Sequence, residues 1–359
     1  MRKLWILAVV LLLAGCETLS YYSQAIGGHL RLINAARPIE SWLADPATSP
    51  ALRERLQTAQ RIREFASRAL ALPDNGSYSS YADLERPYVV WNVFAAAEFS
   101  VEARQECFPF TGCVAYRGFY AEPDARRHAQ KLRSQGYDVY VGGVPAYSTL
   151  GWFDDPLLST FIQYPDTQLA RLVFHELAHQ VAYAKNDTTF NESFAVVVEQ
   201  TGVRRWLEAE GRGTELESFG AAQERKRQFA ARIKQARERL AAVYAAGLPR
   251  AALLDAKRAE FERLRAEYGA IIPAEPNNAF LASIALYSEL VPAFERLLAE
   301  QGGDLGRFYE KARALAALDK AGRTLALGQR GVDDLPERGA QAKPLEPGAQ
   351  ARVRRPLDR

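Results

Sequence analysis

The chain has 359 residues, 48% of them hydrophobic and 25% charged, which is ordinary for a soluble globular protein with one large domain or two small ones. Arg2 and Lys3 lie in a segment that we expect to be removed, and this leaves 44 of the 46 basic residues against 43 acidic ones. A protein that binds nucleic acid needs a concentrated basic face. Because the net charge is near zero, we expect no nucleic-acid partner.

Residues 1–16 have the pattern of a bacterial lipoprotein signal. Arg2 and Lys3 form a short positive start, and Leu4–Leu13 is an apolar run too short to span a bilayer. Leu13-Ala14-Gly15-Cys16 follows and resembles a lipobox, in which cleavage before the cysteine frees it to carry lipid. We expect a signal peptide over 1–15 and a lipidated Cys16. The alternative is an ordinary secretory signal in which Cys16 is incidental.

The residue after the predicted lipidated cysteine predicts a location. An Asp at position 17 would resemble an inner-membrane retention signal, but this chain has Glu17. We therefore expect the protein on the periplasmic side of the outer membrane of a Gram-negative cell. The membrane is thus an expected partner through the lipid on Cys16. Residues 16–34 would be the lipidated cysteine and a tether to the body of the protein.

Helix and strand patterns alternate in the first half of the chain. Residues 35–72 carry apolar side chains at helical spacing and end at a Pro-Asp-Asn-Gly turn. The stretch from 88 to 150 is sheet-rich. Runs of β-branched and aromatic residues predict strands at 88–94, 114–120 and 137–141, and a helix is expected at 122–135.

Cys107 and Cys113 are the only cysteines besides Cys16, and they flank a turn-like Phe-Pro-Phe-Thr-Gly loop. In an oxidising periplasm, two cysteines that close so short a loop predict a disulfide. A metal site is disfavoured because no histidine lies near them in sequence. The alternative is a pair of free buried thiols.

The second half of the chain is predicted to be helical. Residues 165–206 fit two helices joined by a short loop, 222–268 fit a long helical hairpin, and 277–325 fit further helices. Residues 329–359 carry prolines among charged and small residues, which predicts a disordered tail. The expected fold class is α+β, predominantly α, with 35–328 as one domain.

The chemistry concentrates in the motif His175-Glu176-Leu177-Ala178-His179, within a stretch that has no Gly or Pro. On a helix, His175 and His179 lie one turn apart on the same face, so both imidazoles can reach one metal ion. Glu176 is offset to the side, where it can reach a metal-bound water rather than the metal. The alternative is two inert, partly exposed helix histidines. The chain has only four His, two of which fall in this pattern.

The zinc ion of a peptidase is held by three protein ligands, so a third ligand is needed besides the two histidines. One solution would place Gly at 182 and His at 185, and Ala182 and Lys185 exclude it. Glu192 is the next candidate, because a short loop would set its helix antiparallel to the histidine helix. The alternative for Glu192 is the far end of a capping box that begins at Thr189.

Glu199 lies seven residues after Glu192, hence on the same helical face. Three roles stay open for it. It could orient a ligand histidine from behind, replace Glu192 as the ligand, or be an ordinary solvated glutamate.

The motif HELAHQ followed by FNESFA resembles the gluzincin metallopeptidases, whose HExxH helix is followed by a helix with an Asn-Glu pair. In this chain the gap before the Glu is shorter, so the loop between the helices must be trimmed. The sequence is also similar to a family of predicted aminopeptidases among proteobacterial lipoproteins, through the lipobox and the segments WNVFAAAEFS (91–100), CFPFTGCVAYRGFY (107–120), YDVYVGGVPAYSTLGWFDDP (137–156) and NNAFLASIALY (277–287).

The resemblance implies a zincin-like core, in which a small sheet accompanies the HExxH helix and the Glu-bearing helix. His175, His179 and Glu192 would hold one Zn²⁺ per chain, and Asn191 would support the site beside Glu192. Glu176 would act as general base on a zinc-bound water. The oxyanion donor would be Tyr287, for which ordinary packing is the alternative. His29 and His128 are expected at the surface.

Peptides are the expected substrates. Gly142 and Gly143, with Tyr147 after them, could form an edge strand that a peptide approaches closely, or a plain bend between strands. An aminopeptidase would also need a carboxylate for the free α-amine, for which Asp154, Asp155 and Glu199 are candidates.

The first function expected is aminopeptidase activity on periplasmic peptides. One alternative is an endopeptidase of misfolded envelope proteins, which an open cleft without an amine-binding carboxylate would indicate. Another is a non-catalytic zinc-binding scaffold, against which the presence of Glu176 speaks, because a structural zinc site needs no base.

Overall fold

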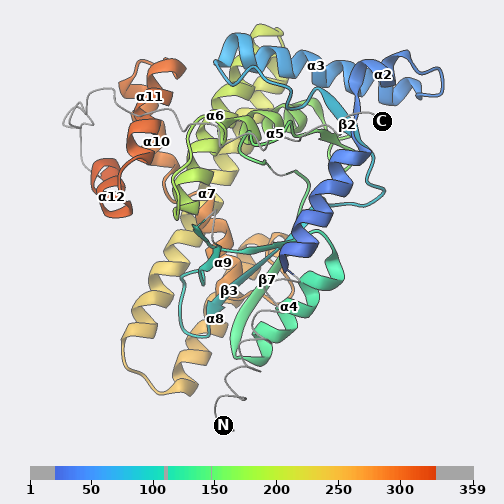
Figure 1. Cartoon of the computed structure of the whole chain (residues 1–359). Coiled ribbons are helices and arrows are strands. Elements are labelled where there is room, and N and C mark those ends of the chain that lie inside the picture. The colour runs from blue at the N-terminus through green and yellow to red at the C-terminus, as the bar shows by residue number, and fades with distance from the viewer. Residues whose placement is uncertain (1–20, 109–111, 147, 329–359) are drawn as a thin grey trace, which may run out of the picture.

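The computed structural model describes residues 21–108, 112–146 and 148–328. These form a mostly helical protein with three small sheets, in agreement with the predicted α+β, predominantly α class (Figure 1). The predictions for the signal peptide, Cys16, Tyr147 and the 329–359 tail lie outside the described residues.

The helices and strands follow the expected order with shifted ends. The helices are α2 (Ile39–Ala44), α3 (Pro50–Leu70), α4 (Glu122–Ser134), α5 (Asp166–Ala178), α6 (Thr188–Ala209), α7 (Gly213–Ala245), α8 (Arg250–Tyr268), α9 (Asn278–Leu286), α10 (Val291–Glu300), α11 (Leu305–Ala316) and α12 (Lys320–Gly328). The strands are β1 (Arg37–Pro38), β2 (Ser80–Ala82), β3 (Val90–Ala97), β4 (Glu106–Phe108), β5 (Gly112–Val114), β6 (Arg117–Phe119), β7 (Tyr137–Val144) and β8 (Leu157–Leu158).

The main sheet has the order β6-β3-β7, with all neighbours antiparallel. Successive residues of a strand point to opposite faces. Trp91, Val93 and Ala95 therefore pack with α4 on one face, while Phe94 and Ala96 pack with α9 on the other. Both faces are covered, which explains why β3 is apolar along its length except at Asn92, rather than alternating apolar and polar.

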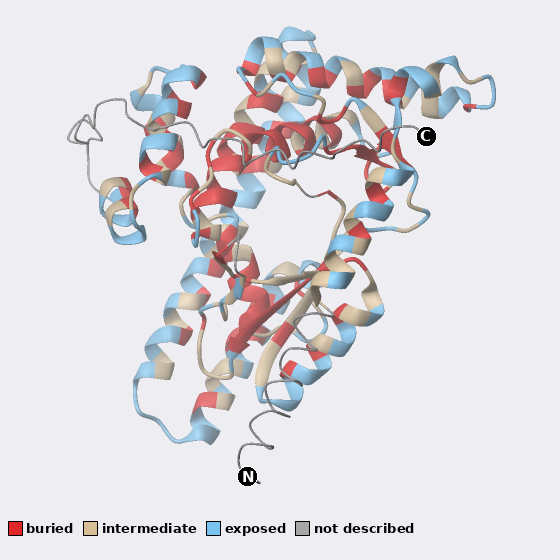
Figure 2. Ribbon diagram, in the orientation of Figure 1, coloured by how far each residue is buried: buried red, intermediate tan, exposed pale blue. Residues whose placement is uncertain are grey.

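The largest core lies around α3, α5 and α6 (Figure 2). Phe174 of α5 and Phe194 of α6 are fully buried there. Gly202 lets the helices approach closely, since a Cβ at this position would lie 2.7 Å from Leu70 and from Phe174. This packing fixes the HExxH helix against the helix that carries Glu192.

The helical pattern predicted over 35–72 forms two helices rather than one. Helix α2 ends at Ala44, and α3 begins at Pro50. The side chain of Ser49, directly before α3, accepts a hydrogen bond from the Leu52 amide. The cause is local. Proline fits the first helical turn but disfavours helical geometry in the residue before it.

The N-terminal helix, residues 21–35, changes the expectation of a plain tether over 16–34. Leu32 belongs to the main core, and Gln24 accepts a hydrogen bond from the Tyr120 amide. Gly28 lies against the Tyr120 ring, where a Cβ would come within 2.2 Å. Residues 21–35 are therefore part of the folded body. Within the part of the chain that the structure describes, no helix combines the length and apolar character that crossing a membrane requires.

The helical hairpin is formed by α7 and α8, with Gly247 in the left-handed region at φ 66° and Pro249 directly before α8. Leu240 of α7 and Phe261 of α8 pack together in a second core that also includes Phe280 of α9. The hairpin thereby supports the far side of the main sheet, which α9 contacts directly.

Candidate metal centre and active-site cleft

Helix α5 presents the two histidines together. It begins at Asp166 after Pro165 and ends at Ala178, with His179 as its C-terminal flanking residue. The ring centroids of His175 and His179 are 4.8 Å apart, and both residues are buried together with Glu176. The geometry is the one expected for residues one helical turn apart.

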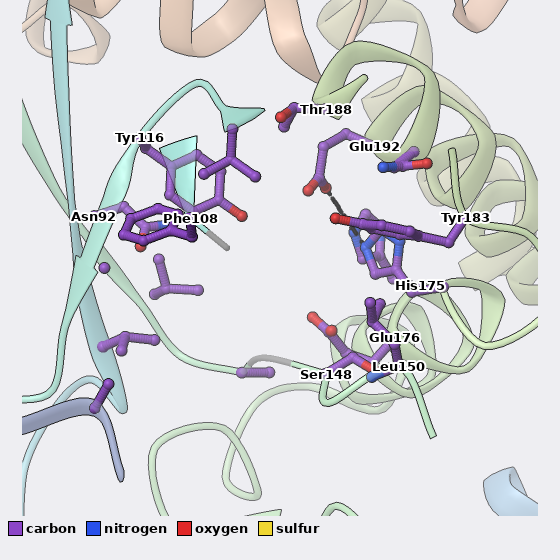
Figure 3. A pocket seen from close by; sticks show the side chains of 18 of the residues that line it. Asn92, Phe108, Tyr116, Ser148, Leu150, His175, Glu176, Tyr183, Thr188 and Glu192 are labelled. Atoms are coloured by element: carbon purple, nitrogen blue, oxygen red, sulfur yellow. Dashed lines mark hydrogen bonds and ion pairs between the residues drawn. The ribbon is translucent and has the colours of Figure 1, made fainter. Parts of the chain in front are cut away.

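Helix α6 brings Glu192 to the histidine pair. Its Oε2 lies 3.2 Å from His175 Nε2 and 3.7 Å from His179 Nε2. The capping-box alternative for Glu192 is wrong, because Asp187 caps this helix and accepts a hydrogen bond from the Phe190 amide. One ligand atom from each of the three residues lies within 4.8 Å of the others, a cluster that could hold a metal ion (Figure 3).

Asn191 holds the short loop between the two helices. Its Oδ1 accepts a hydrogen bond from the Ala184 amide at 2.7 Å, and its Nδ2 donates to the Ala184 carbonyl at 3.0 Å. Because Asn191 precedes Glu192, this double contact fixes the start of α6 relative to the end of α5.

Glu199 lies behind His175. Its Oε2 is 2.9 Å from His175 Nδ1 and 3.1 Å from Arg171 Nη1. A carboxylate on Nδ1 fixes the ring so that Nε2 faces Glu192. The solvated-glutamate alternative is therefore wrong, since Glu199 is buried.

Charges in the cluster are strongly coupled. Burial raises the pKa of Glu192, but the positive charge of His179 and the hydrogen bonds to both histidines outweigh it and lower the pKa to about 2. Burial lowers the pKa of His175, but the hydrogen bonds that its ring donates to Glu192 and Glu199 outweigh this effect and raise the pKa to about 10. The two carboxylates thus stabilise a proton on His175, at the position where they could also stabilise a metal cation. Metal binding would release this proton.

Glu176 has a different environment from Glu192. Burial raises its pKa, and the neighbouring charges of His175 and His179 only partly oppose this shift. A carboxyl group whose pKa is raised toward neutral pH is suited to accept a proton and to give it back.

A cavity of about 500 Å³ opens onto the cluster. Figure 3 shows His175, Glu176 and Tyr183 on one side, and Asn92, Phe108 and Tyr116 on the opposite side. Its size is typical of a ligand site. The remaining lining residues are Tyr21, Tyr22, Ala25, Val90, Val114, Gly118, Tyr120, Val144, Ala146, Ser148, Leu150, His179, Thr188, Asn191, Glu192 and Tyr287.

Tyr287 lines this cavity, with its ring centroid 6.4 Å from that of His175. Burial and the negative charge of Glu192 raise the pKa of its hydroxyl well above the ordinary value. The hydroxyl therefore stays protonated and able to donate a hydrogen bond.

The predicted substrate glycines do not line the cavity. Gly142 and Gly143 pair with Asn92 and Trp91 of β3, and a Cβ on Gly143 would meet the Tyr88 ring at 2.3 Å. Gly143 therefore makes room for a side chain of the protein itself. The two other histidines, His29 and His128, also lie outside the cavity, half-buried against aromatic rings rather than at the open surface.

The predicted disulfide is confirmed, with Cys107 of β4 bonded to Cys113 of β5. The hairpin that it closes contributes Phe108 to the cavity wall. Phe108 stacks on Tyr21, ring centroids 5.2 Å apart, which joins the hairpin to the N-terminal helix. Sequence reasoning missed these wall residues because aromatic side chains in their stretches have no spacing that indicates catalysis or metal binding.

Fold and site together define a mostly helical protein with a buried His-His-Glu cluster, a candidate metal site, at the wall of a cavity. A family model described as "Putative aminopeptidase" matches residues 20–327, and the chain belongs to this family. Membership supports a function of the peptidase type. No curated protein and no solved structure matches the chain.

Proposed function

We propose that the protein is a zinc-dependent peptidase of the gluzincin type. The observation that carries this proposal is the convergence of His175, His179 and Glu192, whose ligand atoms all lie within 4.8 Å of one another. Two imidazoles and one carboxylate form a ligand set of catalytic zinc sites, which leave a further position open. The donor set fits this group, and Glu199 supplies the partner that a ligating histidine usually has.

The residues around the cluster would each have a separate role in the reaction. Zinc, when bound, supplies Lewis acidity for the peptide carbonyl. Glu176 accepts a proton from the attacking water and passes it to the leaving amine. Tyr287 donates a hydrogen bond to the oxygen on which negative charge develops.

We also propose that the protein acts on the periplasmic side of the outer membrane, held by lipid on Cys16. The lipobox-like Leu13-Ala14-Gly15-Cys16 supports this proposal. The family description names an aminopeptidase, as the sequence predicted, and supports peptide hydrolysis as the reaction. The chemistry of the cleft bears on where in a peptide the cut falls.

The proposal is tested by the zinc content of the full chain, purified in detergent, beside its Glu192→Ala variant. We expect about one zinc per wild-type chain and much weaker binding in the variant, because two ligands cannot complete the site. Metal analysis after dialysis against a weak chelator provides the measurement. A wild-type chain that takes up no zinc when the metal is supplied would overturn the zinc proposal.

Glu199→Gln should weaken zinc binding about 10- to 100-fold, because a carboxylate partner fixes the ring and raises the basicity of a ligating histidine. The measurement is a competition titration with a zinc chelator. Glu208→Gln is the matched control, an exposed position on the same helix, and should bind zinc like the wild type. If the two variants bind alike, Glu199 has no orienting role.

A further inference from the structure

The cleft has an unusual chemical character for a site that would bind a free amino terminus. Among its lining residues in the described part of the chain, the only carboxylates are Glu176 and Glu192, and there is no Lys or Arg. Six tyrosines and Phe108 dominate the rest, together with small aliphatic side chains.

Both lining carboxylates are already engaged. In the zinc-loaded state, the two positive charges of the ion would be balanced by Glu192 and Glu176. Behind the cluster, Glu199 is balanced by Arg171 at 3.1 Å. No negative charge is left over among the described residues that line the cleft, and burying a substrate ammonium without a counter-charge is strongly unfavourable.

The other carboxylates considered for the α-amine do not reach the cavity. Asp155 is only 3% exposed, and its Oδ2 accepts a hydrogen bond from the Thr149 amide at 2.9 Å. Asp154 is exposed and lies beside Gly76, outside the lining. The role expected for Asp154, Asp155 or Glu199 therefore has no support in the structure.

The wall opposite the metal cluster is built to receive apolar groups. Tyr21 of the N-terminal helix is stacked on Phe108, and the Arg117 guanidinium, which does not line the cavity, lies 4.1 Å from the centroid of the Tyr21 ring. Tyr116, which also lines the cavity, packs against Phe94 of the main sheet. Such a wall favours aromatic or aliphatic side chains of a ligand.

We propose that the cleft binds an uncharged, apolar stretch within a polypeptide and that the protein cuts there as an endopeptidase, rather than removing amino-terminal residues. This inference rests on the proposed zinc-peptidase function. In the reaction, water adds to an internal peptide carbonyl, the C–N bond breaks, and Glu176 carries one proton from water to the leaving nitrogen. The products are a new carboxylic acid and a new amine, and transfer of the remaining water proton from the acid to the amine gives a carboxylate and an ammonium group.

The test uses the full chain in detergent, loaded with zinc, and two peptides of one sequence with Phe, Leu and Tyr at the centre. One peptide is N-acetylated and the other has a free α-amine. We expect both to be cut internally, with kcat/KM values within about threefold of each other, and the single-residue substrate Leu-amide to be cut at least tenfold more slowly. Release of amino-terminal residues alone, abolished by acetylation, would overturn the inference while leaving a zinc peptidase in place.

A binding measurement separates recognition from turnover. Two peptide hydroxamates, one acetylated and one with a free amine, should bind the zinc-loaded chain with similar affinity by calorimetry. Tenfold tighter binding of the free-amine compound would contradict the inference. A chain that neither takes up zinc nor cuts either peptide would overturn the proposed function and this inference together.

Thr188 offers a matched pair of variants. It lines the cleft beside Glu192 (Figure 3) and lies in the first turn of α6, where an acidic side chain is compatible with the helix. Thr188→Asp supplies the missing carboxylate and should shift the preference toward the free-amine hydroxamate about tenfold, while Thr188→Asn, of the same size, should not. Equal preferences in the two variants would contradict the charge argument.

Discussion

Replacing Glu176 with Gln should lower kcat/KM for peptide hydrolysis by about 10²- to 10⁴-fold, the range typical of losing a general base. Gln has the same shape but cannot accept the proton of the attacking water. The measurement is a steady-state assay of the zinc-loaded chain with the acetylated peptide described above. Because the group acts in the chemical step, the loss should fall on kcat more than on KM.

The zinc content and the melting temperature of this variant serve as controls. Glu176 is buried beside the cluster but lies outside the set of three converging ligand atoms, so zinc should still bind with a stoichiometry of about one. The neutral side chain also removes a buried carboxyl whose pKa burial has raised, so folding should not suffer. A fully active, zinc-loaded Glu176→Gln chain would rule out the assigned base.

The sequence predicted the centre of the site because helical geometry alone brings His175 and His179 together. Glu192 required more, since its role depends on where α6 begins. The residues allowed either a capping box from Thr189 or a turn toward the histidines, and Asp187 as the actual cap leaves Glu192 to the histidines. The two caps, Asp187 and Thr189, differ by two residues in helix start, which is within the error of any helix boundary predicted from sequence.

The cleft walls could not be predicted from the sequence in the same way. Tyr21 and Tyr22 come from a segment whose nearness to the predicted anchor suggested a tether, and only tertiary packing against Phe108 and Tyr120 brings them to the site. Gly142 and Gly143 illustrate the opposite error. A glycine pair in a strand suggests close approach by another chain, but at Gly143 the approaching group is the Tyr88 ring of the same protein.

A buried ion pair far along the chain holds the start of the Glu192 helix. Arg323 of α12 and Asp187 are 3% and 5% exposed, with Nε donating to Oδ2 at 2.9 Å. Asp187 caps α6 through its other oxygen, five residues before Glu192. Arg323 also donates to the carbonyls of Ala316 and Leu318, so one side chain joins α12, the end of α11 and the start of α6.

Arg323→Met should therefore destabilise the protein by about 3–5 kcal/mol, because it leaves the Asp187 carboxylate buried without its partner. The measurement is urea unfolding followed by circular dichroism. Arg250→Met is the control. It breaks an ion pair with Glu98 whose side chains are 67% and 34% exposed, and it should cost less than about 1 kcal/mol.

The double variant Asp187→Asn/Arg323→Met distinguishes an unpaired charge from lost packing. Asn still caps a helix but carries no charge, so the double variant should recover most of the stability that Arg323→Met loses. If the loss came from packing over Phe190, whose ring centroid lies 5.6 Å from the Arg323 guanidinium, the second substitution would recover nothing. Because Asp187 fixes the helix start that turns Glu192 toward the histidines, recovery of zinc affinity should follow recovery of stability in the same double variant.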